Sequence, residues 1–273
     1  MEIETEIQRE YNPAHPNFER WQKARNLSDE RAKFVESIVS ELVFLSGLNV
    51  LDLGAGEGST SQLLSKNNFV VSVEIKRERI IKIQLSDTLH PVLADCINVP
   101  LKNKSVDLII LQDVVEHINF GCDFIEKLFF LLKDNGLIFL STPNKYSLLN
   151  LISDPHWGLP FISVLNRHKI KKYFLKYFRK ADFNRSDIAE LLSLNDIYTK
   201  FDKKFSIHLF TNYSVEYLLS GGKGLIWSNF HLSIVRLINS LGLKRVLLKI
   251  ANDKPGFINK YLTPTFYVLL KKI

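Results

Sequence analysis

The chain has 273 residues, of which 46% are hydrophobic and 24% are charged, a balance that excludes wholesale disorder and allows one large domain with an insertion. The formal net charge of +7 is compatible with a nucleic acid, an anionic membrane surface or an acidic ligand, so it selects none of them. A transmembrane span is not expected, because no run of about 18 uncharged apolar residues is present.

Strand and helix patterns alternate through the first half of the chain. An irregular start, up to Pro16, precedes a helix predicted over 28–45. The predicted strands that follow are 49–53, 69–74, 91–94, 106–112 and 136–141, and the predicted helices between them are 59–66, 76–86 and 122–132. This alternation predicts an α/β fold with a doubly wound, mostly parallel sheet, whose buried strands are apolar on both faces.

The alternation stops after Pro143. Residues 144–206 are predicted to form a helical insertion after the fifth strand, at the sheet edge where substrates bind in such folds. A helix at 214–219, a strand near 225–227, a helix near 230–250 and a final strand at 265–271 would complete a seven-stranded sheet. We therefore expect an N-terminal helical cap over 1–47 and one main domain over 48–273.

A glycine-rich loop follows the first predicted strand. Its sequence is Gly54-Ala55-Gly56-Glu57-Gly58, and glycines there let the backbone turn sharply and approach a ligand. The spacing is Gly-x-Gly-x-Gly, which differs from the Gly-x-Gly-x-x-Gly of dinucleotide sites. No Lys-Ser/Thr pair follows, so a nucleoside triphosphate loop is also a poor match.

Three carboxylates lie at successive strand ends along the same edge. Asp52 is next to the glycine loop, Glu74 ends the second strand, and Asp95 follows the third. Glu74 is placed to accept both ribose hydroxyls of an adenosine. Asp95 is placed to accept from an adenine amino group, with Cys96 beside the ring. Together with the loop they predict a site for an adenosine-containing cofactor.

This set of motifs resembles the class I S-adenosylmethionine-dependent methyltransferases, and within them the small-molecule branch that includes the ubiquinone-biosynthesis O-methyltransferases. The resemblance is carried by Val50–Leu64, Glu74, Asp95, Asp113–Ile118 and Ser141–Asn144. It implies a Rossmann-like methyltransferase fold that binds S-adenosylmethionine. It further implies that Gly54, Gly56 and Gly58 contact the methionine end of the cofactor. Glu74 would hold the ribose, Asp95 the adenine, and the backbone carbonyl of Gln112 the amino group.

Three histidines are candidate catalytic residues. The sulfonium is already an activated methyl donor, so a hydroxyl acceptor mainly needs alignment and a base that removes its proton. His208 is the first choice, because relatives carry a histidine before the following helix, facing the active site. His117 and His156 are the alternatives. Asp113, Glu116 and His117 also match an acidic-x-x-Glu-His cluster that has been linked to a divalent metal, although a role in orienting the loop is favoured and no metal is expected.

Two segments, one basic and one apolar, could contact a binding partner. Lysines and aromatic residues alternate over 169–180, which predicts either an amphipathic lid with a solvated face or a surface for an anionic acceptor, a lipid headgroup or RNA. An apolar stripe over 230–241 precedes Lys244, Arg245 and Lys249, which favours core packing and allows shallow peripheral membrane contact. Over residues 11–21, the resemblance implies a segment that folds over the cofactor.

The leading hypothesis is therefore methyl transfer to an oxygen of a small-molecule or glycan-type acceptor. An RNA methyltransferase is the runner-up, but the fourth strand lacks the Asn/Asp-Pro-Pro-Tyr signature and no RNA-binding module is visible, so nucleic acid is not the expected partner. A catalytically inactive, cofactor-binding regulatory protein and an NAD-dependent oxidoreductase are further alternatives. Cys96 and Cys122 have neither metal nor disulfide spacing, and the acidic start lacks the features of a signal peptide, so a cytoplasmic location is expected.

Overall fold

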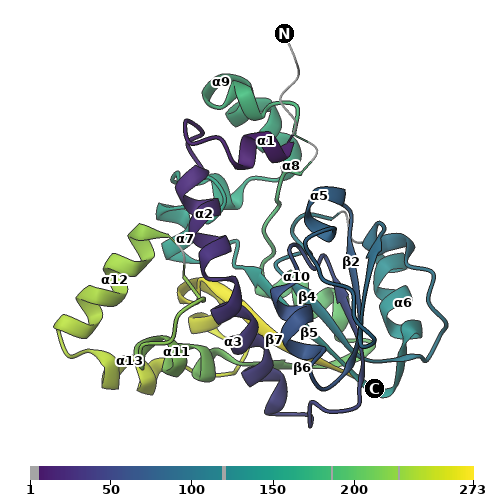
Figure 1. Cartoon of the computed structure of the whole chain (residues 1–273). Coiled ribbons are helices and arrows are strands. Elements are labelled where there is room, and N and C mark those ends of the chain that lie inside the picture. Colours follow the sequence, from purple (N-terminus) through teal and green to yellow (C-terminus); the bar gives the residue numbers. More distant parts are fainter. Residues whose placement is uncertain (1–5, 119–120, 186, 227) are drawn as a thin grey trace.

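The computed structural model describes residues 6–118, 121–185, 187–226 and 228–273. The acidic start considered above (residues 1–5) and Trp227, at the end of one predicted strand, lie outside these ranges. Among the described residues, no helix combines the length and the apolar character that crossing a membrane requires. Figure 1 shows a central sheet with helices on both of its faces.

The sheet has seven strands in the order β3-β2-β1-β4-β5-β7-β6, and only β7 runs antiparallel to its neighbours. The strands are β1 Asn49–Leu53, β2 Phe69–Glu74, β3 Leu89–Leu93, β4 Val106–Gln112, β5 Leu132–Pro143, β6 Phe205–Leu209 and β7 Thr265–Lys272. This confirms the predicted doubly wound, mostly parallel sheet. Pro91 is tolerated in β3 because β3 is an edge strand, where a missing backbone N–H leaves no neighbour unpaired.

The core has two layers, one on each face of the sheet. Alternate residues of β1 show why its sequence is apolar throughout: Leu51 and Leu53 pack on one face, and Val50 packs on the other. The first layer includes buried residues of α6 (Cys122–Leu131) and α10 (Leu194–Phe201). The second includes residues of α3 (Ser28–Ser40), α4 (Ser59–Leu64) and α5 (Arg77–Ile80), and α11 (Thr211–Leu219) packs against it.

The remaining α-helices belong to the N-terminus and to two insertions. They are α1 Glu6–Glu10, α2 Phe18–Asn26, α7 Leu148–Ile152, α8 Arg167–Lys169, α9 Lys176–Phe178, α12 Asn229–Ser240 and α13 Lys244–Ile250. A π-helical segment, Ile170–Leu175, joins α8 to α9. The helical insertion expected after the fifth strand is therefore present, and a second one lies between α11 and β7.

Several predicted boundaries are wrong. The helix predicted over 28–45 ends at Ser40, and the one predicted over 76–86 is reduced to α5. Leu225 and Ile226 form no strand. The sixth strand is instead β6, whose Phe205 and Leu209 are buried and which pairs with β7. The predicted end of the insertion at residue 206 therefore falls inside a strand.

The N-terminal helices and the first insertion form a cap over one end of the sheet. Figure 1 shows α1 beside α8 and α9 at the top of the molecule. The buried carboxylate of Asp182 joins the two segments, because it lies 3.2 Å from Nε2 of His15 and 3.9 Å from Nη1 of Arg9. In contrast, α3 packs against α4 and the sheet. The cap was predicted over 1–47, but α3, near its end, contributes to the core of the main domain.

Candidate functional site

The glycine loop follows β1 with three residues in the left-handed region. The backbone φ angles are +74° at Gly54, +59° at Gly56 and +87° at Gly58. A Cβ at Gly54 would lie 2.5 Å from Val114, and one at Gly58 would lie 2.6 Å from Ile83. A Cβ at Gly56 would meet no atom within 4 Å. Packing therefore requires glycine at 54 and 58, whereas Gly56 leaves the face of the loop open to a ligand.

Two buried carboxylates, Glu74 and Asp52, lie next to this loop. The side chain of Glu74 accepts hydrogen bonds from the backbone N–H of Gly56 at 2.9 Å and of Lys76 at 2.8 Å. Asp52 is 2% exposed and accepts a 2.5 Å hydrogen bond from Ser61 Oγ. Burial raises the pKa of Asp52 to about 6, and the nearby charge of Glu74 adds to this. Glu74 therefore fixes the loop conformation through Gly56, and Asp52 joins the end of β1 to α4, the helix that follows the loop.

A cavity of about 270 Å³ opens on the glycine loop. Six of the residues predicted to bind the cofactor line it: Asp52, Gly54, Ala55, Gly56, Gly58 and Gln112. Glu74 touches this site through its bond to Gly56 and is not itself a lining residue. The loop and the end of β4 thus form one wall, as the strand order requires.

The predicted adenine residues lie outside the lining of this cavity. Asp95 accepts a hydrogen bond from the backbone N–H of Ile97 at 3.0 Å and so caps the short turn Cys96–Asn98. Burial raises the pKa of the Cys96 thiol to about 11, with the charge of Asp95 adding to this, so the thiol is protonated at neutral pH. The assignment of Asp95 and Cys96 to the adenine remains a prediction.

The N-terminal segment closes the other side of the cavity. Tyr11 donates to Glu57 of the loop at 2.9 Å. Glu10, itself a lining residue, accepts two hydrogen bonds from Arg79 at 2.7 and 2.8 Å and one from Lys76 at 3.2 Å. Burial alone would raise the pKa of Glu10, but Arg79 and Lys76 lower it. The sequence motifs did not identify Glu10 or Arg79, because this ion pair joins positions far apart in the chain.

Asp113 occupies a strained position at the end of β4, where its φ is +55°. Its backbone N–H and one carboxylate oxygen are bonded to Ser141, and the other carboxylate oxygen is paired with Arg31. The structure thereby corrects the metal set suggested by the sequence, because the carboxylate of Asp113 is already held by these two partners and does not join Glu116 and His117.

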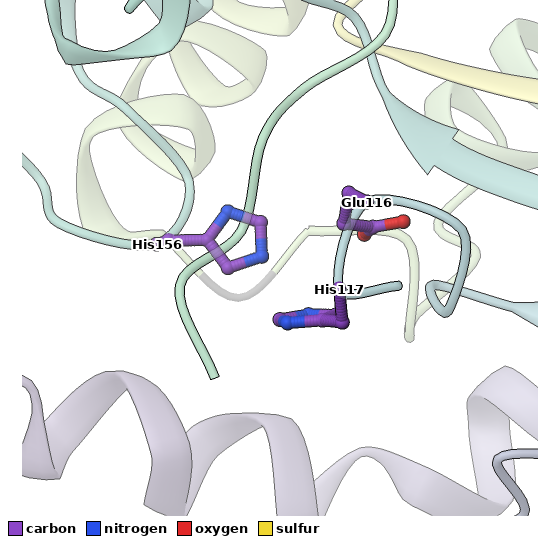
Figure 2. A group of neighbouring side chains, drawn as sticks. All are labelled: Glu116, His117 and His156. Atoms are coloured by element: carbon purple, nitrogen blue, oxygen red, sulfur yellow. The ribbon is translucent and has the colours of Figure 1, made fainter. Parts of the chain in front are cut away.

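Glu116 and His117 instead meet His156, which comes from the insertion. Figure 2 shows the three side chains converging from two separate loops. Each offers a potential ligand atom, and these atoms all lie within 4.8 Å of one another. The rings of His117 and His156 contact edge to face, with centroids 5.2 Å apart. Two of the predicted catalytic histidines therefore lie in one cluster.

His117 is paired with Asp187, a residue that the sequence analysis missed. The carboxylate of Asp187 contacts Nδ1 of His117, which leaves Nε2 to face other groups. Burial alone would lower the pKa of His117, but Asp187 raises it. Reciprocally, burial would raise the pKa of Asp187, but His117, Arg185 and Lys76 hold it well below its usual range. An imidazole oriented by a carboxylate is a suitable acceptor for the proton of a bound hydroxyl.

The cluster lies beside the cofactor cavity. Lys76 contacts both Glu10, which lines the cavity, and Asp187, at 3.2 and 3.8 Å. The guanidinium of Arg185 lies 5.5 Å from the ring centre of Trp21, another lining residue, and 3.9 Å from Asp187. Lys76 and Arg185 therefore each contact both a residue of the cavity wall and Asp187, the partner of His117.

The same cluster has donor atoms that suit a divalent ion. Among the described residues, Oε1 of Glu116 and Nδ1 of His156 are buried and have no hydrogen-bond partner. Burial raises the pKa of Glu116 to about 7 and lowers that of His156 to about 3. A carboxylate with two imidazoles is a donor set found at zinc-class sites. Glu116, His117 and His156 are thus the residues that could hold an ion.

His208 does not belong to this site, which corrects its sequence-based assignment as the general base. It lies on β6, the outermost strand, where residues alternate between the two faces. Phe205 and Leu209 point into the core, whereas His208 is exposed and its Nε2 lies 3.2 Å from Ser206 Oγ. It therefore faces neither the glycine loop nor the cluster of His117 and His156.

Comparison with known proteins identifies similar chains. A family model described as a methyltransferase domain matches residues 20–185. A malonyl-[acyl-carrier protein] O-methyltransferase of a Marinomonas species is 25% identical over 242 residues, which cover 82% of this chain and 87% of that protein.

Solved structures share the fold. A crystal structure of an S-adenosylmethionine-dependent methyltransferase from Mesorhizobium loti has a TM-score of 0.54 at 13% identity, covering 88% of this chain and 98% of that one. A phosphoethanolamine N-methyltransferase 2 of Haemonchus contortus, crystallised with S-adenosylhomocysteine, has a TM-score of 0.51 at 13% identity, covering 88% of this chain and 52% of that one. At this identity the two structures bear on the fold alone.

Proposed function

The chain belongs to the methyltransferase-domain family, and from this premise we propose that it uses S-adenosylmethionine to methylate an oxygen atom of a small-molecule or glycan-type acceptor. The observation that carries the proposal is the pairing of His117 with Asp187 beside the cofactor cavity. The similarity to an O-methyltransferase of Marinomonas adds support for an oxygen acceptor.

The chemistry needs little beyond alignment and one proton transfer. The cofactor supplies a methyl group on a sulfonium, and the acceptor oxygen must approach in line with the carbon–sulfur bond. A hydroxyl attacks well only if its proton leaves as the new bond forms. His117 takes this proton on Nε2, while Asp187 holds the ring through Nδ1 and stabilises the imidazolium.

His156 and Glu116 shape the acceptor side of the site. Because loss of solvation lowers the pKa of the half-buried His156 to about 3, its imidazole stays neutral beside His117 and adds no charge that would oppose proton uptake. A divalent ion bound by Glu116, His117 and His156 would supply a Lewis acid that lowers the pKa of an acceptor hydroxyl. Chelation distinguishes this ion-assisted route from catalysis by His117 alone.

The test measures transfer of labelled methyl groups from S-adenosylmethionine to a metabolite extract, with products identified by mass spectrometry. His117→Gln is expected to lower kcat on the order of 10²–10³-fold, because a positioned base contributes about that much. His208→Gln, at an exposed histidine of the same chain, is the matched control and should retain turnover. A result with full turnover in His117→Gln and loss in His208→Gln would contradict the assignment of the base.

A chelation arm completes the experiment. Treatment of the wild-type protein with EDTA is expected to leave turnover unchanged if His117 acts alone. A loss of turnover that added Zn²⁺ or Mg²⁺ restores would assign the cluster to an ion, with the oxygen acceptor retained. Products that carry the label only on nitrogen or carbon would refute the proposed acceptor in either case.

A further inference from the structure

A second cavity, separate from the cofactor site, lies under the helices of the second insertion. It has a volume of about 230 Å³, is partly open to the surface, and is lined mainly by α11, α12, α13 and β7. Its walls are mostly aliphatic and include Val215, Leu219, Val235, Ile238, Leu247 and Ile258. An apolar cavity of about 150 Å³ is already large enough to bind benzene, so this one can hold a longer hydrocarbon group.

Two polar side chains in this cavity have unused hydrogen-bonding groups. Ser228 is 4% exposed and His231 is 7% exposed, and both line the cavity. Among the described residues, neither Ser228 Oγ nor His231 Nε2 has a hydrogen-bond partner. A buried polar atom without a partner costs free energy, so its presence in an apolar wall indicates a ligand with a polar group.

Two residues that line this cavity are next in sequence to His156 and to the hydrogen-bond partner of Glu116. Pro155 lines the cavity and directly precedes His156. Pro143 also lines it and directly follows Thr142, whose hydroxyl donates to Glu116 at 2.9 Å. The wall of the cavity therefore includes the residue before His156 and the residue after the hydrogen-bond partner of Glu116.

The outer surface of the same helices combines apolar and basic residues. Figure 1 shows α12 and α13 at one side of the molecule, away from β2 and α6. Leu237, Leu241 and Val246 are 57%, 60% and 50% exposed. The sequence from Asn229 to Asn252 has no acidic residue, and it contains Arg236, Lys244, Arg245 and Lys249. This composition suits contact with an anionic lipid surface.

We propose that the cavity between α11, α12, α13 and β7 binds the hydrocarbon chain of a membrane lipid that serves as methyl acceptor. Its polar group is held by Ser228 and His231, and the hairpin of α12 and α13 contacts the bilayer from which the lipid comes. This inference rests on the proposed function for the identity of the acceptor. The binding of a chain and of a bilayer is measured without cofactor, so its failure can be distinguished from failure of methyl transfer.

The first arm titrates the wild-type protein with straight-chain alcohols from butanol to decanol by calorimetry. Affinity is expected to rise about fourfold per added methylene until the cavity is full, since burying a methylene contributes about 0.8 kcal/mol. Val235→Trp, which fills the cavity, should reduce decanol affinity more than tenfold. The matched control is Leu237→Trp on the exposed face of the same helix, which should bind decanol as the wild-type protein does.

Both variants are checked for folding by circular dichroism and by S-adenosylmethionine affinity, which should be unchanged. If Val235→Trp fails to fold, Val235→Phe and the chain-length series on the wild-type protein still decide the outcome. The cavity assignment is overturned if affinity does not depend on chain length, or if Leu237→Trp weakens decanol binding as much as the cavity variant does.

The second arm tests the lipid source by cosedimentation with vesicles. The wild-type protein should bind phosphatidylglycerol vesicles at least tenfold more tightly than phosphatidylcholine vesicles. The double variant Leu237→Gln/Leu241→Gln should lose this binding and keep decanol affinity. Decanol binding without any vesicle binding by the wild-type protein would overturn the membrane source.

Discussion

Replacement of Gly56 by alanine is the sharpest perturbation of the cofactor cavity. The backbone φ of +59° makes any side chain there strained by roughly 1–2 kcal/mol, while the added Cβ meets no protein atom within 4 Å. The methyl group therefore projects into the cavity in which we expect S-adenosylmethionine to bind. Overpacking a close contact costs 1–3 kcal/mol, so we expect S-adenosylmethionine to bind about 30-fold more weakly, equivalent to ~2 kcal/mol.

Gly47→Ala separates backbone strain from loss of the binding surface. Gly47 has a φ of +73°, and a Cβ there also meets nothing within 4 Å, but it precedes β1 and does not line the cavity. Both variants should lose similar free energy of unfolding in urea titrations. Only Gly56→Ala should lose affinity in calorimetric titrations with S-adenosylmethionine. Equal cofactor affinity in the two variants would refute the view that Gly56 faces the ligand.

Other residues of the site give two further predictions. Because burial raises the pKa of Asp52 to about 6 in the folded state, its contribution to stability is present below pH 4 and is lost as the pH rises through 6. Asp52→Asn should remove that loss, so between pH 4 and 7 its free energy of unfolding should rise by up to about 3 kcal/mol relative to that of the wild type. Urea unfolding at each pH measures this difference. A difference that does not depend on pH would contradict the raised pKa. Glu10→Gln removes a charged hydrogen-bond partner of Arg79 and should speed cofactor dissociation roughly tenfold in stopped-flow measurements, and an unchanged rate would exclude a closing role for the N-terminal segment.

The parts of the site that local sequence predicts are those built by consecutive residues. The glycine loop could be recognised because its left-handed backbone and close contacts restrict the residue type at 54 and 58. The pairing of His117 with Asp187 could not, because the two residues are 70 positions apart and only the path of the insertion brings them together. Asp113 matched a metal pattern, but its partner Arg31 lies on α3.

The strand predicted near 225–227 and the assignment of His208 as the base were wrong for a common reason. Short apolar runs do not by themselves distinguish a strand from a buried loop, so Leu225 and Ile226 were as good a candidate for the sixth strand as Phe205–Leu209. Which run pairs with β7 depends on tertiary contacts. The face on which His208 lies follows from that choice, because residues of a strand alternate between faces.

The most direct test of the central claim uses S-adenosylmethionine labelled with ¹³C in the transferred methyl group. The wild-type protein is incubated with this cofactor and, in separate samples, with a metabolite extract and a lipid extract, and the ¹³C chemical shift of the product methyl is recorded. We predict a methoxy resonance whose rate of appearance falls on the order of 10²–10³-fold with His117→Gln and is unaffected by His208→Gln. A resonance of an N-methyl or C-methyl group, or no transfer by the wild-type protein, would contradict the account.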